Sequence, residues 1–407
     1  MRSALLQVRS ITRFCTLGFS EVVRVLLIIG CTLIAGLSLP SVVRDAISEL
    51  SRDRIDRHSD ILPPAIGRTS LFHRIERSFD RRFLLREPFR ASRAWVDYYL
   101  VESSTVPEVY VGRSGWLYYR DELDDYRKAA CSQAGEMEAM ALRLQEVERI
   151  VVASGRNFVF MVAPNKSTIY PEHVGLSQSV MCSKSRYDLL LEALQKHPLD
   201  NFVRLDDLLM TAKDEKQVYF KMDTHWNDEG VLIVVRALLR HIQPQGHGKI
   251  LSNAQVTSQR WRGDLTYMLG LHVHEVSPYV VVANDGVVRR EEPSTPESRV
   301  RHLRTVRAAI DHEPLLPPVV IYGDSFMENP LRLIETVFSR VDAYWRQGAI
   351  DSEGIRIPMG GSERALLASQ TVIFETVERH LPYLRIEPER FREVFDIPQS
   401  DLEERTP

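Results

Sequence analysis

Short apolar runs alternate with longer amphipathic segments over most of the chain after residue 107. Residues Glu136–Ser154 carry apolar side chains at near-helical spacing, which predicts a helix that ends at Gly155. The run Asn157–Val162 (NFVFMV) follows at once and predicts a short buried strand. The first part of this region therefore predicts a helix followed by a strand.

The same alternation continues toward the C-terminus. The pattern predicts further helices at Tyr187–Lys196, Gly230–Ile242 and Glu328–Ser339, and strands at Phe202–Arg204, Val218–Phe220, Val319–Tyr322 and Thr371–Phe374. Asn227 or Asp228 is expected to cap the helix that starts near Gly230. Such an order favours an α/β fold with a mostly parallel sheet flanked by helices on both faces. In these sheets functional groups gather where strands end and helices begin.

A separate apolar segment lies near the N-terminus. Residues 25–43 contain no charged side chain, and as a helix they would span about 28 Å, close to the thickness of a bilayer core. Three interpretations are open: a retained transmembrane signal-anchor, a signal peptide cleaved after Ser38, and a buried helix. We favour the anchor, an N-terminal transmembrane helix, because the polar approach to the apolar run is long for a signal peptide.

These patterns divide the chain into five segments. We expect a cytoplasmic N-terminal segment (1–24), the transmembrane signal-anchor (25–43), a linker with approach helices (44–100), the main α/β domain (101–390) and a disordered tail (391–407). The last ten residues are polar and acidic, which is typical of disorder.

Composition and charge narrow the function only slightly. The 407 residues are 44% hydrophobic and 26% charged, as in a globular protein with a substantial core. The net charge of −3 gives no indication of a nucleic-acid partner. Cys131 and Cys182 are the cysteines of the main domain. They fit a disulfide in an oxidising compartment, or two unrelated buried thiols.

The motif Gly323-Asp324-Ser325-Phe326 directly follows an apolar run. A serine on a tight turn between strand and helix exposes its hydroxyl and its backbone N–H. It can therefore attack a carbonyl and help to hold the resulting oxyanion. Gly323 permits a sharp turn. The alternative is an ordinary turn with an Asp-Ser helix cap.

The motif Asp223-Thr224-His225-Trp226 supplies a base for such a serine. Imidazole titrates near neutral pH, and a carboxylate can fix its tautomer and stabilise its charged form. Residues two apart in an extended segment point the same way, so Asp223 and His225 are expected on one side of the loop. A structural loop whose Asp caps the next helix is the alternative interpretation.

No cofactor or metal is expected. His272 and His274 form a His-x-His that could ligate a metal, but the Val-rich context favours an ordinary strand face. Neither a phosphate-binding loop nor a dinucleotide-binding fingerprint occurs.

At this point the sequence resembles the alginate O-acetyltransferase family of AlgJ and AlgX, whose domain is similar to SGNH hydrolases. The resemblance covers roughly residues 75–385 and rests on ordered segments: Glu108–Tyr119 (EVYVGRSGWLYY), Ala163–Glu172 (APNKSTIYPE), Asp223–Trp226 (DTHW), Gly263–Leu265 (GDL), Gly323–Phe326 (GDSF) and Val372–Arg379 (VIFETVER). It implies an SGNH hydrolase-like, flavodoxin-like sheet with a permuted order of motifs, because in common SGNH hydrolases the GDS segment comes first.

The resemblance also implies roles for residues. Ser325 would be the nucleophile, His225 the base and Asp223 its orienting carboxylate, while Asp324 would shape the turn. Four residues are expected to contribute to the substrate or oxyanion site: Asn165, Tyr170, Trp226 and Gly323. Asn165 and Tyr170 are included because they follow a predicted strand end, and a purely structural part is the alternative for both. For Trp226, packing in the core is the favoured interpretation over stacking on a sugar.

The implied activity is an extracytoplasmic O-acetyltransferase that acetylates hydroxyls of an alginate-like or cellulose-like exopolysaccharide through an acetyl-serine. The expected partners are the polysaccharide acceptor, a multispan membrane O-acyltransferase that supplies acetyl groups, and other polysaccharide secretion components. The protein would then be a single-pass inner-membrane protein with its catalytic domain in the periplasm. A polysaccharide acetyl esterase and a non-catalytic scaffold of a secretion complex are the alternatives.

Overall fold

The computed structural model describes residues 94–104, 106–127, 133–175, 184–245, 251, 254–282, 288–291, 300–307, 315–346 and 354–398. All of them belong to one compact unit, Ala94–Pro407. This unit begins before residue 101, the expected start of the main domain, because Ala94 and Tyr98 are buried against other residues of the unit.

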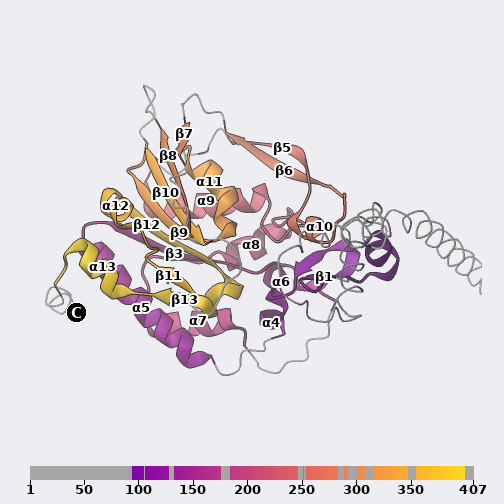
Figure 1. The fold of residues 1–407 in the computed structure, drawn as a ribbon, viewed down its shortest axis with the longest axis horizontal. Helices are drawn as coiled ribbons and strands as arrows, with labels where there is room; N and C mark the ends of the chain where they lie inside the picture. Colours follow the sequence, from indigo (N-terminus) through magenta and orange to yellow (C-terminus); the bar gives the residue numbers. More distant parts are fainter. Residues whose placement is uncertain are drawn as a thin grey trace, which may run out of the picture. The chain divides into compact units, whose positions relative to one another are not determined.

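A seven-stranded sheet forms the centre of this unit (Figure 1). Its spatial order is β4 (Phe202–Val203), β3 (Asn157–Ala163), β12 (Thr371–Val377), β9 (Val319–Gly323), β10 (Arg340–Arg346), β8 (Val300–Arg307) and β7 (Val288–Glu291). Neighbours from β4 to β10 are parallel, whereas β8 and β7 are antiparallel. The expected mostly parallel α/β sheet is therefore confirmed.

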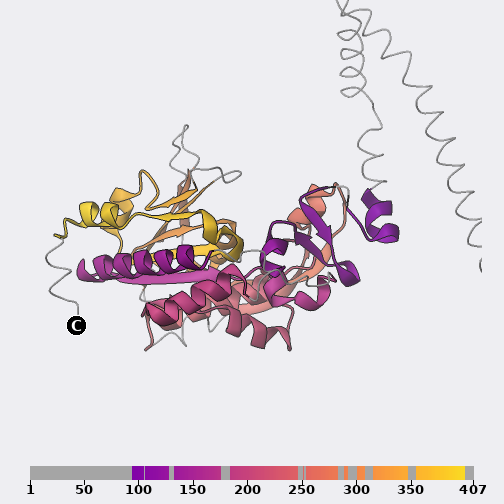
Figure 2. The same ribbon diagram turned by 90° about the horizontal axis from the view of Figure 1, so that it is seen from below.

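Helices cover both faces of the sheet (Figures 1 and 2). On one face Val159 and Met161 of β3 belong to the core that includes residues of α8 (Asp206–Lys213), α9 (Asp228–Ile242) and α11 (Glu328–Ile334). On the other face Phe158 and Phe160 belong to the core that includes residues of α5 (Ala134–Ala153), α7 (Arg186–Lys196), α12 (Glu363–Ala368) and α13 (Pro388–Phe395). Successive residues of β3 thus enter opposite cores, as a strand buried on both faces requires.

A smaller group of elements lies beyond one end of the sheet (Figure 2). Its core joins η1 (Asp97–Val101), the β1–β2 hairpin (Val109–Val111, Leu117–Tyr119) and α10 (Asp264–Met268). The antiparallel pair of β5 (Ala254–Trp261) and β6 (Glu275–Val282) flanks α10 in sequence. The remaining elements are η2 (Arg113–Gly115), α4 (Glu122–Tyr126), α6 (Lys166–Ile169), η3 (Pro171–His173), η4 (Ser325–Met327), β11 (Ile355–Ile357), η5 (Glu378–Tyr383) and β13 (Leu384–Ile386).

Several predicted elements differ from the structure at their ends. Residues Val218–Phe220 form no strand; a single bridge joins Tyr219 to Trp226, because this segment turns back on itself after four residues. The helix expected over Glu328–Ser339 ends at Ile334. Asn227 caps α9, because its side chain accepts hydrogen bonds from the backbone N–H groups of Glu229 and Gly230. Of the two expected caps, Asn227 and Asp228, the structure therefore has the first.

The expected location as a single-pass inner-membrane protein is corrected. Among the described residues no helix combines the length and apolarity that crossing a bilayer requires. The apolar run 25–43, on which that expectation depended, lies outside the described residues, as do the linker up to residue 93 and both Cys131 and Cys182. The disordered tail expected from residue 391 is also corrected, because Phe391 is fully buried within α13.

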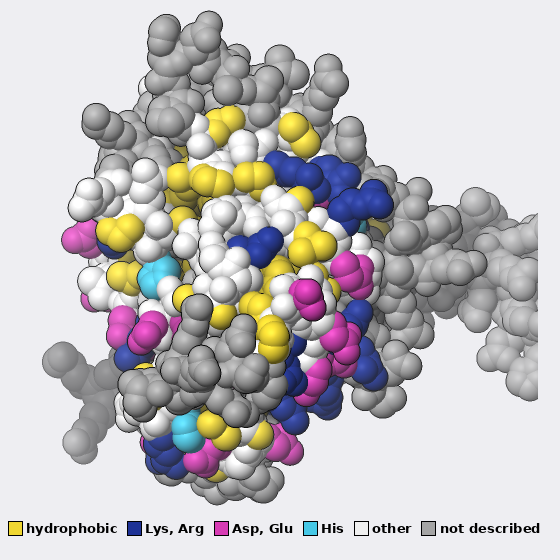
Figure 3. Space-filling model, turned by 90° about the vertical axis from the view of Figure 1, so that its left-hand side faces the viewer, with side chains coloured by type: hydrophobic (Ala, Val, Ile, Leu, Met, Phe, Trp, Pro, Cys, Tyr) yellow, Lys and Arg dark blue, Asp and Glu magenta, His cyan; other side chains and the backbone are white. Residues whose placement is uncertain are grey.

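The surface in Figure 3 carries basic, acidic and hydrophobic side chains next to one another. A group of Lys and Arg side chains lies toward the upper right, but neither sign of charge covers this face. This distribution differs from the continuous basic stripe that is typical of nucleic-acid binding.

Candidate active site

Ser325 lies on a tight turn that the end of β9 presents at the carboxyl edge of the sheet. All five residues of β9 are buried. The next residue, Asp324, caps η4 with Oδ1, which accepts the backbone N–H of Phe326 at 2.9 Å. Its Oδ2 accepts the backbone N–H of Val377 at 2.8 Å and Nδ1 of His380 at 3.0 Å. Asp324 therefore fixes the turn to the end of β12 and leaves Ser325 to face His225.

Gly323 allows this turn to sit against its neighbours. A Cβ at this position would lie 2.8 Å from Cγ of Met327 and 2.9 Å from Oε2 of Glu375. That carboxyl oxygen accepts the backbone N–H of Asp324 at 3.1 Å. The glycine is required here by close packing, rather than by an unusual backbone angle.

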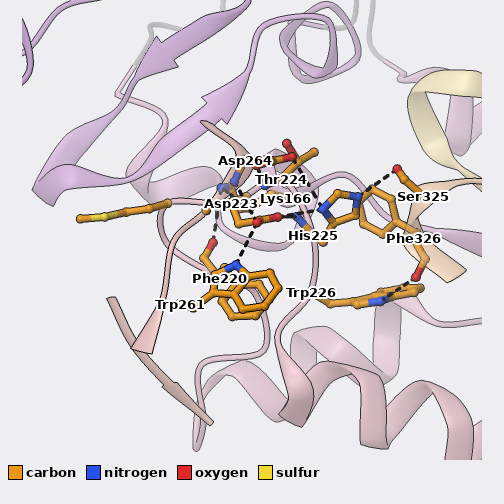
Figure 4. A network of polar contacts seen from close by, with 12 residues as sticks. Lys166, Phe220, Asp223, Thr224, His225, Trp226, Trp261, Asp264, Ser325 and Phe326 are labelled. Atoms are coloured by element: carbon orange, nitrogen blue, oxygen red, sulfur yellow. Dashed lines mark hydrogen bonds and ion pairs between the residues drawn. The ribbon is translucent and has the colours of Figure 1, made fainter. Parts of the chain in front are cut away.

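The three residues predicted as a triad form one hydrogen-bonded chain (Figure 4). Ser325 Oγ lies 2.9 Å from His225 Nε2, and His225 Nδ1 lies 2.7 Å from Asp223 Oδ1. Because Nδ1 donates to the carboxylate, Nε2 carries the lone pair and can accept the serine proton. Serine and histidine are 100 residues apart in the sequence, so the sheet brings them together.

The Asp223 carboxylate is saturated with donors. Oδ1 also accepts the backbone N–H of His225 at 3.0 Å. Oδ2 accepts Nε1 of Trp261 at 2.9 Å and the backbone N–H of Asp264 at 3.0 Å. Burial by itself would raise the pKa of this carboxyl, but the hydrogen bond and charge of His225, with the bond from Trp261, hold the pKa well below its ordinary value. Asp223 is therefore anionic when His225 accepts a proton.

His225 experiences opposing influences. Burial would lower the pKa of the imidazole, but the hydrogen bond and charge of Asp223, with the charge of Asp264, outweigh it and raise the pKa above its ordinary value. Asp264 Oδ2 lies 3.7 Å from His225 Nδ1. The positive charge of Arg379 acts in the opposite direction. Two carboxylates thus support the protonated imidazole that a transfer mechanism forms.

The loop that carries Asp223 and His225 is held from three sides (Figure 4). Asp264 Oδ1 accepts the backbone N–H of Thr224 at 2.8 Å. Nε1 of Trp226 donates to the backbone carbonyl of Phe326 at 3.0 Å and joins the histidine loop to the serine turn. The fully buried Lys166 donates from Nζ to the backbone carbonyl of Asp223 at 2.6 Å.

The residues expected to line the site have other contacts. Asn165 is fully buried, and it donates from Nδ2 to Asp125 at 3.2 Å and from its backbone N–H to Glu378 at 2.9 Å. The Tyr170 hydroxyl accepts the backbone N–H of Val218 at 2.9 Å, and its ring packs on Trp116. Neither makes a hydrogen bond with the triad, because each is used to join neighbouring segments. Trp226 is fully buried, as its favoured interpretation expected.

The same region holds three side chains of metal-ligating types. Ligand atoms of Asp223, His225 and Asp264 lie within 4.8 Å of one another. The oxygens of Asp223 already accept four N–H donors, and both ring nitrogens of His225 are hydrogen-bonded. The chemistry of this donor set therefore fits a proton-transfer chain better than a cation. His272 and His274 are exposed and lie before β6, so the expected strand face is wrong for them.

Trp261, Asp264 and Lys166 were not assigned roles from the sequence. Asp264 lies in the Gly-Asp-Leu segment and Lys166 in the Ala163–Glu172 segment, both of which carry the family resemblance. A Cβ at Gly263 would lie 2.0 Å from the backbone oxygen of Met222. That close approach is the signal that the Gly-Asp-Leu segment packs against the histidine loop.

A protein family and several curated proteins are similar to this chain in sequence. The family described as SGNH hydrolase-like domain, acetyltransferase AlgX, matches residues 109–352. The chain is 26% identical over 332 residues to the probable alginate O-acetylase AlgJ of Pseudomonas fluorescens, covering 76% of this chain and 77% of that protein. It is 29% identical over 168 residues to the probable alginate O-acetylase AlgJ of Pseudomonas aeruginosa, covering 41% of each, which is less than half of that relative's length.

Solved structures of other proteins are also similar to this chain. The O-acetyltransferase domain of Pseudomonas putida AlgJ has a TM-score of 0.46 and 19% identity, over 72% of this chain and 100% of that domain. Bacillus cereus PatB1, in a form with a sulfonyl adduct, has a TM-score of 0.46 and 12% identity, over 65% of this chain and 92% of that protein.

Proposed function

The chain belongs to the family of SGNH hydrolase-like domains described as acetyltransferase AlgX, and we propose that it transfers acetyl groups to hydroxyls of a polysaccharide through an acetyl-Ser325 intermediate. The observation that carries the proposal is the continuous hydrogen-bonded chain Asp223–His225–Ser325 at the carboxyl edge of the sheet. A nucleophile, a base and an orienting carboxylate in this order supply the nucleophilic and proton-transfer part of acyl transfer.

In the first half-reaction Ser325 Oγ attacks the carbonyl carbon of an acetyl ester while its proton moves to His225 Nε2. The tetrahedral intermediate collapses, the bond to the leaving group breaks, and His225 returns the proton to the departing oxygen. The products are acetyl-Ser325 and the free alcohol of the donor. Asp223 remains anionic and stabilises the imidazolium in between.

In the second half-reaction a sugar hydroxyl replaces the donor alcohol. Its oxygen attacks the acetyl carbon and its proton passes to His225 Nε2. The bond to Ser325 Oγ then breaks, and the serine recovers its proton from His225. The cycle returns the enzyme unchanged and leaves one acetyl ester on the saccharide.

The names of the curated relatives support an alginate-like acceptor, since they are called probable alginate O-acetylases. We further propose that a multispan membrane O-acyltransferase supplies the acetyl group and that other secretion components bring the polymer. These partners follow from the family resemblance, and the acceptor is the part that can be tested directly with purified protein.

The deciding experiment uses the full chain with an activated acetyl ester such as 4-nitrophenyl acetate, with and without oligosaccharides. Wild type is expected to release nitrophenol and to add acetyl mass to an oligosaccharide. Ser325→Ala is expected to lose both activities, whereas Ser339→Ala keeps them, because Ser339 precedes β10 at the opposite, amino edge of the parallel strands. Mass spectrometry of wild type treated with the ester in the absence of an acceptor should find a mass increase of about 42 on the peptide that contains Ser325, as one acetyl group adds.

The remaining outcomes separate the alternatives. Serine-dependent acetate release with no acetylated saccharide would indicate an esterase. A folded wild type and Ser325→Ala that are equally inert on every ester would overturn the catalytic proposal in favour of a scaffold.

A further inference from the structure

His380 forms a second histidine–aspartate pair next to the triad. Nδ1 of its ring lies 3.0 Å from Oδ2 of Asp324, the residue that directly precedes Ser325. The His380 side chain is 22% exposed, and among the described residues Asp324 is the one hydrogen-bond partner of its ring. No motif of the sequence points to this histidine, and the proposed transfer cycle does not use it. An imidazole bound to the neighbour of the nucleophile therefore requires an explanation of its own.

The Asp324 carboxylate accepts three N–H donors. Oδ1 accepts the backbone N–H of Phe326, and Oδ2 accepts the backbone N–H of Val377 together with His380 Nδ1. Burial would raise the pKa of this carboxyl, but the hydrogen bond and charge of His380, with the two backbone donors, hold the pKa below its ordinary value. Asp324 is therefore an anion, and the hydrogen bonds that it accepts are of the stronger, charge-assisted kind.

These hydrogen bonds join the serine turn to the segment around the end of β12. Val377 is the last residue of β12, and His380 follows three residues later in η5, so both donors to Oδ2 come from one short stretch. The backbone N–H of Asp324 donates to Oε2 of Glu375, also on β12, at 3.1 Å. Among the described residues His380 supplies the one side-chain donor to the Asp324 carboxylate. A substitution at His380 can therefore remove one of these bonds and leave the backbone unchanged.

The position of Asp324 determines where the Ser325 hydroxyl lies. The two residues are adjacent, and Ser325 Oγ must stay within hydrogen-bond reach of His225 Nε2, which is 2.9 Å away (Figure 4). If Oδ2 loses one of its two donors, the carboxylate is less firmly held and the backbone of the turn can shift with it. A displacement of about 1 Å can lower a reaction rate about 10²-fold. Alignment of the nucleophile thus depends on how firmly Asp324 is held.

We propose that His380 is a positioning residue, which keeps the Ser325 hydroxyl aligned with His225 by donating a hydrogen bond from Nδ1 to Asp324. The inference rests on the proposed role of Ser325 as nucleophile and adds a residue that this role depends on. It requires no contact between His380 and either substrate, because His380 acts through Asp324. Its loss should therefore slow the formation of acetyl-Ser325 without weakening the binding of the ester.

Three substitutions in the full chain separate the hydrogen bond of His380 from its bulk. Asparagine carries an N–H donor on the atom that corresponds to Nδ1, glutamine carries it one bond further out, and leucine has no donor. With 4-nitrophenyl acetate we expect His380→Asn to keep kcat within about threefold of wild type. His380→Gln and His380→Leu should lower kcat about tenfold or more, with KM changed less than about twofold. A role in packing alone predicts the reverse order, because glutamine and leucine fill more space than asparagine.

A second measurement follows the serine directly. Covalent labelling of Ser325 by a sulfonyl fluoride needs the same aligned hydroxyl but no acetyl ester, so its rate should follow the same order. His197→Leu is the matched control, because His197 also pairs with a carboxylate, Glu138 at 3.3 Å, and its side chain is 27% exposed. His197 precedes β4, at the amino edge of the parallel strands, so its substitution should leave both rates unchanged.

The remaining outcomes would overturn the inference. If His380→Asn is no faster than His380→Gln and His380→Leu in either measurement, the donor at Nδ1 does not align the serine. If none of the three variants folds, as thermal unfolding would show, His380 is needed for the fold instead. Equal ester cleavage by wild type and Ser325→Ala would show that the proposed function itself fails. A wrong order of the His380 variants beside an active, serine-dependent wild type refutes this inference alone.

Discussion

Replacing Asp223 by asparagine tests the arrangement of donors around this carboxylate. All four groups that approach its oxygens are N–H donors: the side chain and backbone of His225 on Oδ1, and Trp261 and the backbone of Asp264 on Oδ2. An asparagine presents one acceptor and one donor. If its NH2 faces Trp261 and Asp264, two buried donors clash. If it faces His225, only the backbone N–H clashes, because the imidazole can change tautomer.

The second orientation is therefore expected, and it changes which ring nitrogen of His225 carries the proton. His225 Nδ1 would accept from the asparagine, so Nε2 would carry its proton toward Ser325 and could no longer take one. A comparable loss of tautomer control lowers kcat about 10⁴-fold in a serine protease triad, and we expect a similar fall in ester cleavage here. One unsatisfied buried donor and the loss of charge-assisted bonds cost about 2–4 kcal/mol. In a unit that extends over Ala94–Pro407, where 1 kcal/mol corresponds to about 1.5 °C, the melting temperature should fall by about 3–6 °C.

The assay combines initial rates of ester cleavage with thermal unfolding followed by circular dichroism. Asp264→Asn is the matched control, because the Asp264 side chain is 40% exposed and its Oδ1, which accepts the Thr224 N–H, can be replaced by an amide oxygen. It should melt within about 2 °C of wild type, the range of an ordinary surface substitution. An Asp223→Asn enzyme with wild-type melting temperature and activity within tenfold of wild type would refute the donor arrangement.

Two further predictions follow from the site. His225 must be neutral to act as a base, and Asp223 and Asp264 raise the pKa of its imidazole against the effect of burial. The rate of ester cleavage should therefore increase with pH, with a midpoint above the ordinary imidazole value of about 6.5. Asp264→Asn should move this midpoint to lower pH, and an unchanged pH–rate profile would contradict the role of Asp264. Gly323→Ala introduces a Cβ that would lie 2.8 Å from Met327 and 2.9 Å from Glu375. It should destabilise the protein by about 1–3 kcal/mol and lower kcat in the same unfolding and rate measurements. Gly360→Ala is the control and should change neither quantity, because no atom lies within 4 Å of the added carbon.

The central strands could be predicted from the sequence because they are continuously apolar. Residues 158–162 and 319–322 are buried, so no exposed polar position interrupts the apolar pattern. The antiparallel strands β8 and β10 were not predicted, since Val300–Arg307 and Arg340–Arg346 contain many arginines. In the structure the carboxylate of Asp342 accepts from His302, Arg304 and Arg340, and such a cross-strand charge cluster has no signature in a local window.

Residues of the site could be predicted from the sequence only where they lie in short, recognisable motifs. Asp223, His225 and Ser325 lie in two segments whose residue types suit nucleophilic catalysis. Asp264 and Arg379 lie near the site only because of the tertiary structure. Their local sequences predict no more than the start of a helix for Asp264 and the end of a strand for Arg379. Asn165 illustrates the opposite case: its place after a strand predicted a lining residue, but nearby carboxyl groups of Asp125 and Glu378 bind it instead.

The place of β12 has a consequence for when activity appears during synthesis. This strand pairs with β3 on one side and β9 on the other, and its partner on β3 precedes it by more than 200 residues, as the pairing of Asn157 with Thr371 shows. The serine turn is fastened to the same strand and to His380 through Asp324. A ribosome must therefore release nearly the whole domain before nucleophile and base can meet. Long-range pairing of this kind is slow to form, so we infer that the growing chain does not hold Asp223, His225 and Ser325 together until β12 has paired.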